Sequence, residues 1–271
     1  MSVKFKLALC QMKVVTDKLT NLDKAESMIR SAALNGSRII SLPEIFNCPY
    51  SNKFFRQYAE DDSGPTVGLL SRLAKELSVY IIGGSIPELA GDSVYNTCYI
   101  INSKGDIIGK HRKIHLFDID VKGGISVKES DSLTAGENVT VIDTEYARIG
   151  VAICYDIRFP ELIRMMTLKG AQLIVLPAAF SAVTGPAHWD IVLRTRAVDN
   201  QVYLAAVSPA RDMEGPYQAY GHSCIITPWG DYAALTDHRE SVIYGDIDLD
   251  YMYEIRNQLP LLKHRRPDLY E

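Results

Sequence analysis

Short apolar runs alternate with longer amphipathic segments along most of the chain, and this alternation constrains the fold more than any other feature. The apolar runs have the length and composition of buried strands, and they lie at 5–10, 38–42, 79–82, 99–101, 149–153, 173–176, 202–207 and 223–226. The amphipathic segments predicted to be helices lie at 21–34, 65–77, 160–169 and 188–198. Because strand and helix alternate, the sequence predicts an α/β protein.

The second half of the chain departs from this alternation. Strand signals there are separated only by short turns, and they lie at 202–207, 223–227, 231–235 and 242–246. We expect these segments to be neighbouring antiparallel strands, and therefore mixed sheets rather than purely parallel ones. No repeat, low-complexity tract or long linker divides the 271 residues, so we expect a single domain over 1–271.

Composition argues against several classes of protein. Lys and Arg total 29 against 33 Asp and Glu, a net charge of −4, whereas nucleic-acid-binding domains normally present a net basic face. No apolar stretch approaches the ~20 residues that cross a bilayer, and the segment up to Cys10 has no signal-cleavage site. We therefore expect a cytoplasmic protein that binds neither nucleic acid nor membrane.

The cysteines are odd in number, widely spaced and without a CxxC pair, so they suit neither a disulfide framework nor a zinc site. They are Cys10, Cys48, Cys98, Cys154 and Cys224. Cys154 ends an apolar strand, at the strand-to-turn position where α/β enzymes present a nucleophile. The alternative is a small buried hydrophobic residue, which is the commoner role of a cysteine.

A catalytic cysteine needs a base or a cation beside it, because a thiol with a pKa of ~8.5 is mostly protonated at neutral pH. Glu44 directly follows a predicted strand and Lys113 lies in a basic turn, although either alone would be an ordinary surface charge. No histidine has the sequence context of a cysteine protease. The spacing of His111 and His115 invites a metal site, but the HExxH glutamate is absent, so we expect no metal.

Three segments, in this order, resemble the signature segments of the nitrilase (carbon–nitrogen hydrolase) superfamily. They are Leu42-Pro-Glu44, His111-Arg-Lys113 continuing to Leu116, and Cys154-Tyr-Asp-Ile-Arg-Phe-Pro-Glu161. The resemblance spans nearly the whole chain and implies an α-β-β-α sandwich with mixed sheets. It also implies a homodimer formed through the nucleophile side, with the C-terminal tail at about 258–271 in the contact, and a small-molecule amide as the substrate. We expect no cofactor.

Matched residue by residue, the resemblance implies four catalytic roles. Cys154 is similar to the family's nucleophile, Glu44 to its general base and Lys113 to its oxyanion-stabilising cation. Glu129 matches a second glutamate held near the lysine and cysteine. Such a site attacks an amide carbon with sulfur, releases ammonia and hydrolyses the resulting thioester, with the backbone N–H of Tyr155 assisting at the oxyanion.

Further segments are similar to the omega-amidase branch, whose members hydrolyse the terminal amide of 2-oxoglutaramate or 2-oxosuccinamate. They are 115–120, 184–189, 196–203 and 208–211. Deaminated-glutathione amidases share part of this pattern but usually differ at 116–120 and 198–201, so omega-amidase is favoured. A deaminated-glutathione amidase, a carbamoylase or a nitrilase is the alternative within the superfamily, and a non-catalytic dimeric scaffold is the alternative outside enzymes.

Contacts to the substrate are expected from aromatic side chains and one cation. The expected substrate-binding residues are Tyr50, Phe117, Tyr155, Phe180 and Arg211. A dicarboxylate-like substrate needs a cation for its distal carboxylate, and Lys53 and Arg158 are further candidates. We favour an ion pair with Glu161 at the helix start as the role of Arg158.

Overall fold

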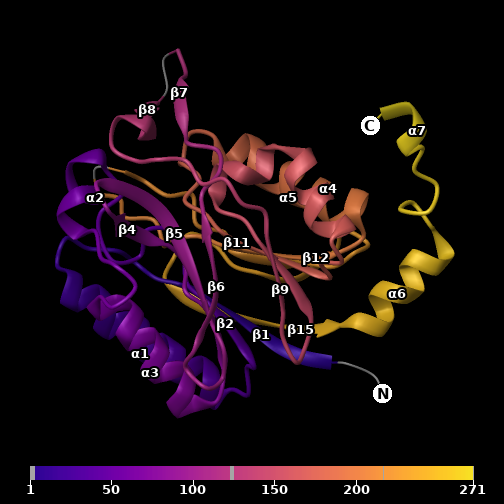
Figure 1. Ribbon diagram of the computed structural model, residues 1–271, viewed down its shortest axis with the longest axis horizontal. Helices are drawn as coiled ribbons and strands as arrows, with labels where there is room; N and C mark the ends of the chain where they lie inside the picture. The colour runs from indigo at the N-terminus through magenta and orange to yellow at the C-terminus, as the bar shows by residue number, and fades with distance from the viewer. Residues whose placement is uncertain (1–3, 123–124, 216, 271) are drawn as a thin grey trace.

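The molecule consists of two sheets packed face to face with helices on both outer sides. The computed structural model describes residues 4–122, 125–215 and 217–270. Figure 1 shows α1 and α3 against the outside of one sheet and α4 and α5 against the outside of the other. This is the α-β-β-α sandwich that the family resemblance implied, and both sheets mix parallel and antiparallel pairs.

The seven-stranded sheet combines three parallel strands with antiparallel neighbours on either side. Its spatial order is β15 (Ser241–Asp248), β1 (Lys4–Gln11), β2 (Ile39–Ser41), β3 (Tyr80–Ile82), β5 (Ser93–Ile101) and β4 (Ile86–Ala90), with β6 (Ile107–Arg112) also paired to β5. The parallel strands are β1, β2 and β3. Their carboxyl ends lie at one edge, where α/β proteins commonly form their sites.

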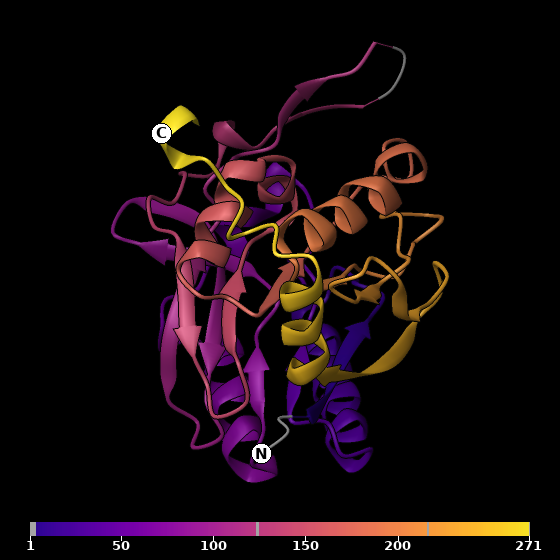
Figure 2. The same cartoon turned by 90° about the vertical axis from the view of Figure 1, so that its right-hand side faces the viewer.

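The six-stranded sheet likewise has three parallel strands at its centre, β10, β11 and β12. Its spatial order is β14 (Tyr232–Leu235), β13 (Cys224–Ile226), β12 (Tyr203–Val207), β11 (Leu173–Pro177), β10 (Arg148–Val151) and β9 (Thr140–Asp143). A separate hairpin, β7 (Asp118–Asp120) with β8 (Ser126–Lys128), projects from the body of the molecule (Figures 1 and 2).

One expected strand pairing is wrong. The segment near 242–246 does not continue the antiparallel strands of the second half, because β15 crosses to the seven-stranded sheet and pairs with β1 over eight residues, from Lys4–Asp248 to Gln11–Ser241. The reason is the number of residues that can form backbone hydrogen bonds with β15. β14 has only four residues, whereas β1 offers a full-length free edge beside the core.

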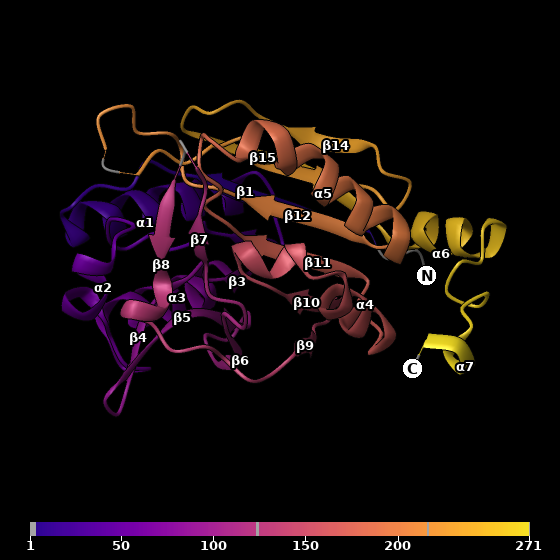
Figure 3. The ribbon, with the colours of Figure 1, turned by 90° about the horizontal axis from the view of Figure 1, so that it is seen from above.

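Helices cover the two outer faces. Their bounds are α1 (Lys18–Leu34), α2 (Asn52–Tyr58), α3 (Pro65–Leu77), α4 (Pro160–Leu168), α5 (Gly185–Asn200), α6 (Leu249–Gln258) and α7 (Pro267–Tyr270). The expected helices are all present, and α1 begins before residue 21 because the Asp17 side chain accepts a hydrogen bond from the N–H of Thr20. Figure 3 shows α5 lying over β12.

The alternation of side chains along β1 explains the two main cores. Leu7 and Leu9 enter the core between the two sheets, whereas Ala8 and Cys10 face the core beneath α1 and α3. Both faces are buried, so the strand reads as a nearly continuous apolar run. No helix among the described residues is long and apolar enough to cross a membrane.

Several elements were not predicted from the sequence. They are α2, β4, β6, β7, β8, β9 and α6 with α7. β6 is typical, because only His111 of its six residues is buried and its polar residues break the apolar signal. Such edge strands are defined by their hydrogen bonds to a neighbour, which no local pattern reports.

Candidate active site

Residues from both sheets and from the hairpin meet at one buried point between them. Glu44 follows β2, Lys113 follows β6, and Glu129 begins the 3₁₀ turn η1 (Glu129–Asp131) after β8. Cys154 begins the 3₁₀ turn η2 (Cys154–Arg158) after β10. All four side chains are buried, Cys154 being 4% exposed. The structure therefore brings together the four residues predicted to be catalytic.

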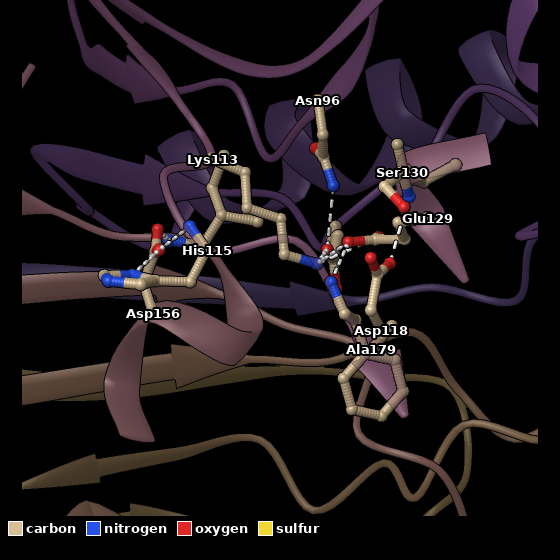
Figure 4. A network of polar contacts seen from close by, with 12 residues as sticks. Asn96, Lys113, His115, Asp118, Glu129, Ser130, Asp156 and Ala179 are labelled. Carbon is tan, nitrogen blue, oxygen red and sulfur yellow. Dashed lines mark hydrogen bonds and ion pairs between the residues drawn. The ribbon is translucent and has the colours of Figure 1, made fainter. Parts of the chain in front are cut away.

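Lys113 lies at the centre of this cluster. Its Nζ donates hydrogen bonds to Glu44 Oε1 at 3.0 Å and to Glu129 Oε1 at 2.9 Å. Burial alone disfavours the ammonium form, but the charges of Glu129 and Glu44 outweigh it, so the pKa of Lys113 is raised well above its usual value. Figure 4 shows its amino group directed at the carboxylate of Glu129. The lysine is therefore a fixed positive charge.

Glu129 uses both of its oxygens for hydrogen bonds. Oε1 accepts from the hydroxyl of Tyr50 at 2.6 Å as well as from Lys113, and Oε2 accepts from the backbone N–H of Phe117 at 2.6 Å. A carboxylate with its lone pairs used in this way is suited to holding a lysine in place, and it is poorly suited to accepting a further proton.

Glu44 differs from Glu129 in having one free oxygen. Oε1 accepts from Lys113 and from Nδ2 of Asn96, the latter at 2.8 Å. Oε2 is buried, and no N–H or O–H donor among the described residues reaches it. Burial, followed by the neighbouring charge of Glu129, raises the pKa of Glu44. Glu44 is therefore the carboxylate that has both the free lone pairs and the raised basicity needed to accept a proton.

The Cys154 thiol lies within hydrogen-bonding reach of the Glu44 carboxylate. Burial raises the pKa of this thiol well above its usual value, and the negative charge of Glu44 adds to the effect. Lys113 and the backbone N–H of Ala179 act in the opposite direction without cancelling it. The resting sulfur is therefore a protonated thiol, and its proton must be removed as it reacts.

Two residues of the site have left-handed backbone conformations. Cys154 has φ 47°, and Ile45, which follows Glu44, has φ 49°. Such a conformation is unfavourable for a β-branched isoleucine, and each strained residue costs on the order of 1–3 kcal/mol. The strain is retained where Glu44 and Cys154 are aimed at each other across the two sheets.

A glycine supports the segment that ends in Glu44. Gly84 has φ 58°, and a Cβ at this position would lie 2.3 Å from the carbonyl oxygen of Pro43. Only glycine allows this approach. The turn after β3 therefore packs directly against the backbone that positions Glu44.

A cavity of about 410 Å³ reaches this cluster, within the ~300–1,000 Å³ range of small-molecule sites. Glu44, Tyr50, Ala179 and Tyr217 are part of its lining. The Tyr217 ring lies 4.6 Å from that of Tyr50, and its hydroxyl donates to the carbonyl oxygen of Ala179. Burial, together with the neighbouring Cys154 and Glu44 side chains, raises the pKa of Tyr217 well above its usual value.

The aromatic residues predicted to contact substrate lie around the cluster. Tyr50 lines the cavity. Phe117 and Tyr155 pack edge to face, with ring centres 5.1 Å apart. Phe180 directly follows Ala179, and its ring centre lies 5.1 Å from that of Trp189.

The candidate cations differ in their surroundings. Arg211 donates to the backbone carbonyl oxygens of Ala219 and Tyr220, at 3.1 and 2.9 Å, so its guanidinium binds the chain itself. Lys53 lies exposed on α2. Among the described residues Arg158 forms no ion pair, and the expected pairing with Glu161 is wrong.

Arg158 is instead directed toward aromatic rings. Its guanidinium carbon lies 4.8 Å from the ring centre of Phe180 and 5.9 Å from that of Tyr155, and Nη1 contacts Nδ1 of His188 at 3.2 Å. Its chain position, four residues after Cys154, explains this placement. Cys154 and Arg158 are the first and last residues of the short turn η2.

The remaining thiols and histidines have other surroundings. Burial raises the pKa of each of the other four cysteines, to about 12 for Cys10 and Cys48. Cys48 also lies near Lys18 and Glu60, which form an ion pair with each other. His111 and His115 both contact Asp156. Within residues 4–122, 125–215 and 217–270, no group of three or more His, Cys, Asp or Glu side chains is arranged to hold a metal ion.

Sequence reasoning missed three residues of the site, Asn96, Ala179 and Tyr217. Asn96 lies on β5, and no local sequence pattern distinguishes it, because its burial is known only from the structure. Ala179 contributes backbone groups, which no residue type predicts. Tyr217 lies in the irregular segment between β12 and β13, where only the tertiary structure brings it to the cavity.

Comparison with known proteins agrees with this geometry. The carbon-nitrogen hydrolase family model matches residues 6–257. The chain is 50% identical to omega-amidase NIT2 of Xenopus tropicalis, over 98% of this chain and 97% of that protein, and 49% identical to omega-amidase NIT2 of Homo sapiens, over 98% and 96%.

Solved structures give the same family. Nit3 of Saccharomyces cerevisiae, a member of branch 10 of the nitrilase superfamily, superposes with a TM-score of 0.90 at 43% identity, covering 97% of each chain. The NitFhit protein of C. elegans superposes with a TM-score of 0.89 at 32% identity, covering all of this chain and 67% of that one. Sequence, fold and relatives agree that the chain belongs to the carbon-nitrogen hydrolase family.

Proposed function

We propose that this protein is an omega-amidase that hydrolyses the terminal amide of 2-oxoglutaramate or 2-oxosuccinamate to the 2-oxo dicarboxylic acid and ammonia. The observation that carries the proposal is the free oxygen of Glu44 on the carboxylate that adjoins the Cys154 thiol, with Lys113 between the two glutamates. Relatives named omega-amidase at about half identity, over nearly the full chain, support the choice of substrate.

The first half of the reaction forms a thioester. Glu44 accepts the thiol proton while the sulfur of Cys154 attacks the amide carbon, because the neutral thiol is a weak nucleophile until its proton is removed. Negative charge then develops on the carbonyl oxygen, where the ammonium of Lys113 and backbone N–H groups stabilise it. Glu44 returns the proton to the amide nitrogen, ammonia leaves, and the acyl group stays on sulfur.

The second half releases the acid. Glu44, again unprotonated, removes a proton from water as the water oxygen attacks the thioester carbon. The oxyanion forms in the same position and collapses with cleavage of the carbon–sulfur bond, and the sulfur regains its proton from Glu44. The net change is amide plus water to carboxylic acid plus ammonia. Glu129 holds Lys113 in position through both halves.

We propose Arg158 as the group that holds the distal carboxylate of the substrate. It is a cation without an acidic partner among the described residues, four positions from the nucleophile, and it lies against Phe180 and Tyr155. Arginine binds a carboxylate through two parallel hydrogen bonds. Arg211 is a weaker candidate because its guanidinium already donates to two backbone carbonyls.

The test is ammonia release from a panel of amides by the purified protein. We expect the highest kcat/KM with 2-oxoglutaramate or 2-oxosuccinamate, and much lower values with deaminated glutathione, carbamoyl amines and nitriles, because pocket contacts set relative kcat/KM. A higher kcat/KM with deaminated glutathione would replace the proposed substrate, and no release from any of them would favour the scaffold alternative.

Arg158→Gln separates recognition of the distal carboxylate from chemistry. It should raise KM for 2-oxoglutaramate by about 10- to 100-fold, as expected for a lost charged contact, and have a much smaller effect on a neutral amide of the same length. Arg211→Gln is the matched comparison. If Arg211→Gln raised KM more than Arg158→Gln, the assignment of the cation would be reversed.

We further propose that the single domain forms a homodimer in the cytoplasm through the outer face of α4 and α5. These helices lie side by side and expose apolar side chains there, Met165 and Leu168 on α4 with Ile191 and Val198 on α5. The tail beyond residue 258 also exposes Leu259 and Leu269. Light scattering should give twice the chain mass, and Ile191→Glu should shift it toward the single-chain value.

A further inference from the structure

The contacts of Asp156 have no role in the reaction described above. Asp156 is fully buried, two residues after Cys154 in η2. Within the part of the chain that the structure describes, four donors form hydrogen bonds to its two carboxylate oxygens. Oδ1 accepts from the backbone N–H and from Nδ1 of His115, at 2.9 and 2.8 Å, and Oδ2 accepts from Nε2 of His111 and the N–H of Ile153, both at 3.0 Å.

These contacts join the two sheets. His111 belongs to β6 of the seven-stranded sheet, and Lys113 lies midway between His111 and His115 in the chain. Asp156 and Ile153 belong to the nucleophile turn after β10 of the six-stranded sheet. The two histidines therefore hold the segment of Lys113 against the segment of Cys154, and Figure 4 shows His115 and Asp156 joined in this way beside Lys113.

Asp156 is held as a carboxylate. Burial alone would favour its protonated form, but hydrogen bonds from His111 and His115 outweigh burial and hold its pKa below the usual range. A carboxylate can only accept, so Nε2 of His111 and Nδ1 of His115 are the protonated ring nitrogens. The remaining nitrogen of His111 contacts Oγ1 of Thr140 at 3.0 Å.

We propose that Asp156 is a positioning residue which, through His111 and His115, sets the separation between the ammonium of Lys113 and the sulfur of Cys154. The other links of Lys113 to its surroundings differ in kind. Its backbone N–H donates to Asn96 O and its carbonyl accepts from the N–H of Gly136, both at 2.8 Å, and neither partner lies on the six-stranded sheet. The proposal rests on the amidase function proposed above, because only that reaction uses Lys113 and Cys154 together.

Two substitutions of His111 isolate the effect of its hydrogen bond to Asp156. The Nε2 amide of His111→Gln occupies the place of the imidazole Nε2 and keeps the contact with Asp156, whereas the Oδ1 oxygen of His111→Asn occupies the place of Nδ1, accepts from the hydroxyl of Thr140, and keeps only that contact. Both remove the same ring. We expect kcat of His111→Gln to exceed that of His111→Asn by at least about tenfold, and KM to differ by less than about threefold. The reason is that misplacement of a catalytic group lowers the rate of the chemical step.

Asp156→Asn provides an independent comparison. An amide can accept at only one of the two sites, so one backbone N–H loses its acceptor, and kcat should fall at least as far as in His111→Asn. Melting temperatures of all three variants show whether they fold. If Asp156→Asn does not fold, the two His111 variants still decide.

Alkylation of Cys154 by iodoacetamide, followed by mass spectrometry of its peptide, gives a readout that does not depend on the substrate. Wild type and His111→Gln should react several-fold faster than His111→Asn. Equal kcat and equal alkylation rates in the two His111 variants would overturn the proposal, as would losses that track the melting temperature alone. If wild type releases no ammonia from 2-oxoglutaramate, the proposed function fails, while the order of alkylation rates still tests the role of Asp156.

Discussion

The two sheets contribute different chemistry to the same site. The seven-stranded sheet provides Glu44 and Lys113, which are charged groups fixed by hydrogen bonds from side chains such as that of Asn96. The six-stranded sheet provides Cys154 on a strained turn, together with the backbone of Ala179. A neutral thiol from one sheet therefore meets its base and its cation from the other. The comparison teaches that neither half can react alone, and that packing between the sheets determines reactivity.

The strongest test of the contribution of the six-stranded sheet is Cys154→Ala. Removing a nucleophile that acts as part of a unit should lower kcat by at least ~10⁴-fold in an ammonia-release assay. Cys224→Ala, a buried thiol on β13 of the same sheet, is the control and should keep kcat. Full activity of Cys154→Ala would show that the thiol does not take part in the reaction.

Substitutions of Glu44 and Glu129 test whether the seven-stranded sheet and the hairpin contribute separate catalytic roles, proton transfer and positioning of Lys113. Glu44→Gln should lower kcat by ~10³-fold or more, because both proton transfers use it, and Glu129→Gln by only ~10- to 100-fold, because it positions Lys113. A larger loss in Glu129→Gln would exchange the two roles.

The pH profile sharpens the same comparison. The pKa of Glu44 is raised, so it becomes protonated and unable to accept the thiol proton at a pH above the usual 4.5 of a glutamate. The acidic limb of kcat/KM should therefore lie above pH 4.5, with activity falling as the pH decreases. A profile that stays flat down to pH 4.5 would contradict the proposed base.

Lys113→Met tests whether catalysis requires the positive charge of Lys113. Its loss should lower kcat by ~10²- to 10³-fold, the effect of removing one oxyanion-stabilising group, and it should lower the melting temperature because two buried carboxylates lose their partner. Lys110→Met is the control, since Lys110 lies on β6, the strand that Lys113 follows, and pairs with Glu88 and Asp62 nearer the surface. An equal loss of kcat in both variants would argue against a specific role.

The smallest expected effect is that of Gly84→Ala, which disturbs the frame without touching a reacting group. The added Cβ would lie 2.3 Å from the carbonyl oxygen of Pro43, so the segment ending in Glu44 must shift. We expect kcat to fall by about tenfold. The free energy of unfolding should fall by an amount on the order of 1–3 kcal/mol, which lowers the melting temperature. Gly36→Ala, at another positive φ with open space around it, should lower stability but leave kcat unchanged.

Much of the fold and of the candidate site could be predicted from local sequence. Strands such as β1 and β11 are buried on both faces, so their apolar runs are continuous, and α1 and α3 have a helical period with clear ends. Glu44 and Cys154 were found at the ends of predicted strands and Lys113 in a basic turn, and the resemblance of their three segments to the nitrilase superfamily assigned their roles. These signals depend only on periodicity and on neighbouring residues.

Only the tertiary structure decided the rest. It assigned β15 to the sheet of β1, left one oxygen of Glu44 free while both oxygens of Glu129 are bound, and turned Arg158 from Glu161 toward Phe180. The physical reason is range. Periodicity and capping depend on residues within a few positions, whereas sheet membership, the partner of a buried charge and a shifted pKa depend on groups far apart in the chain that packing brings together.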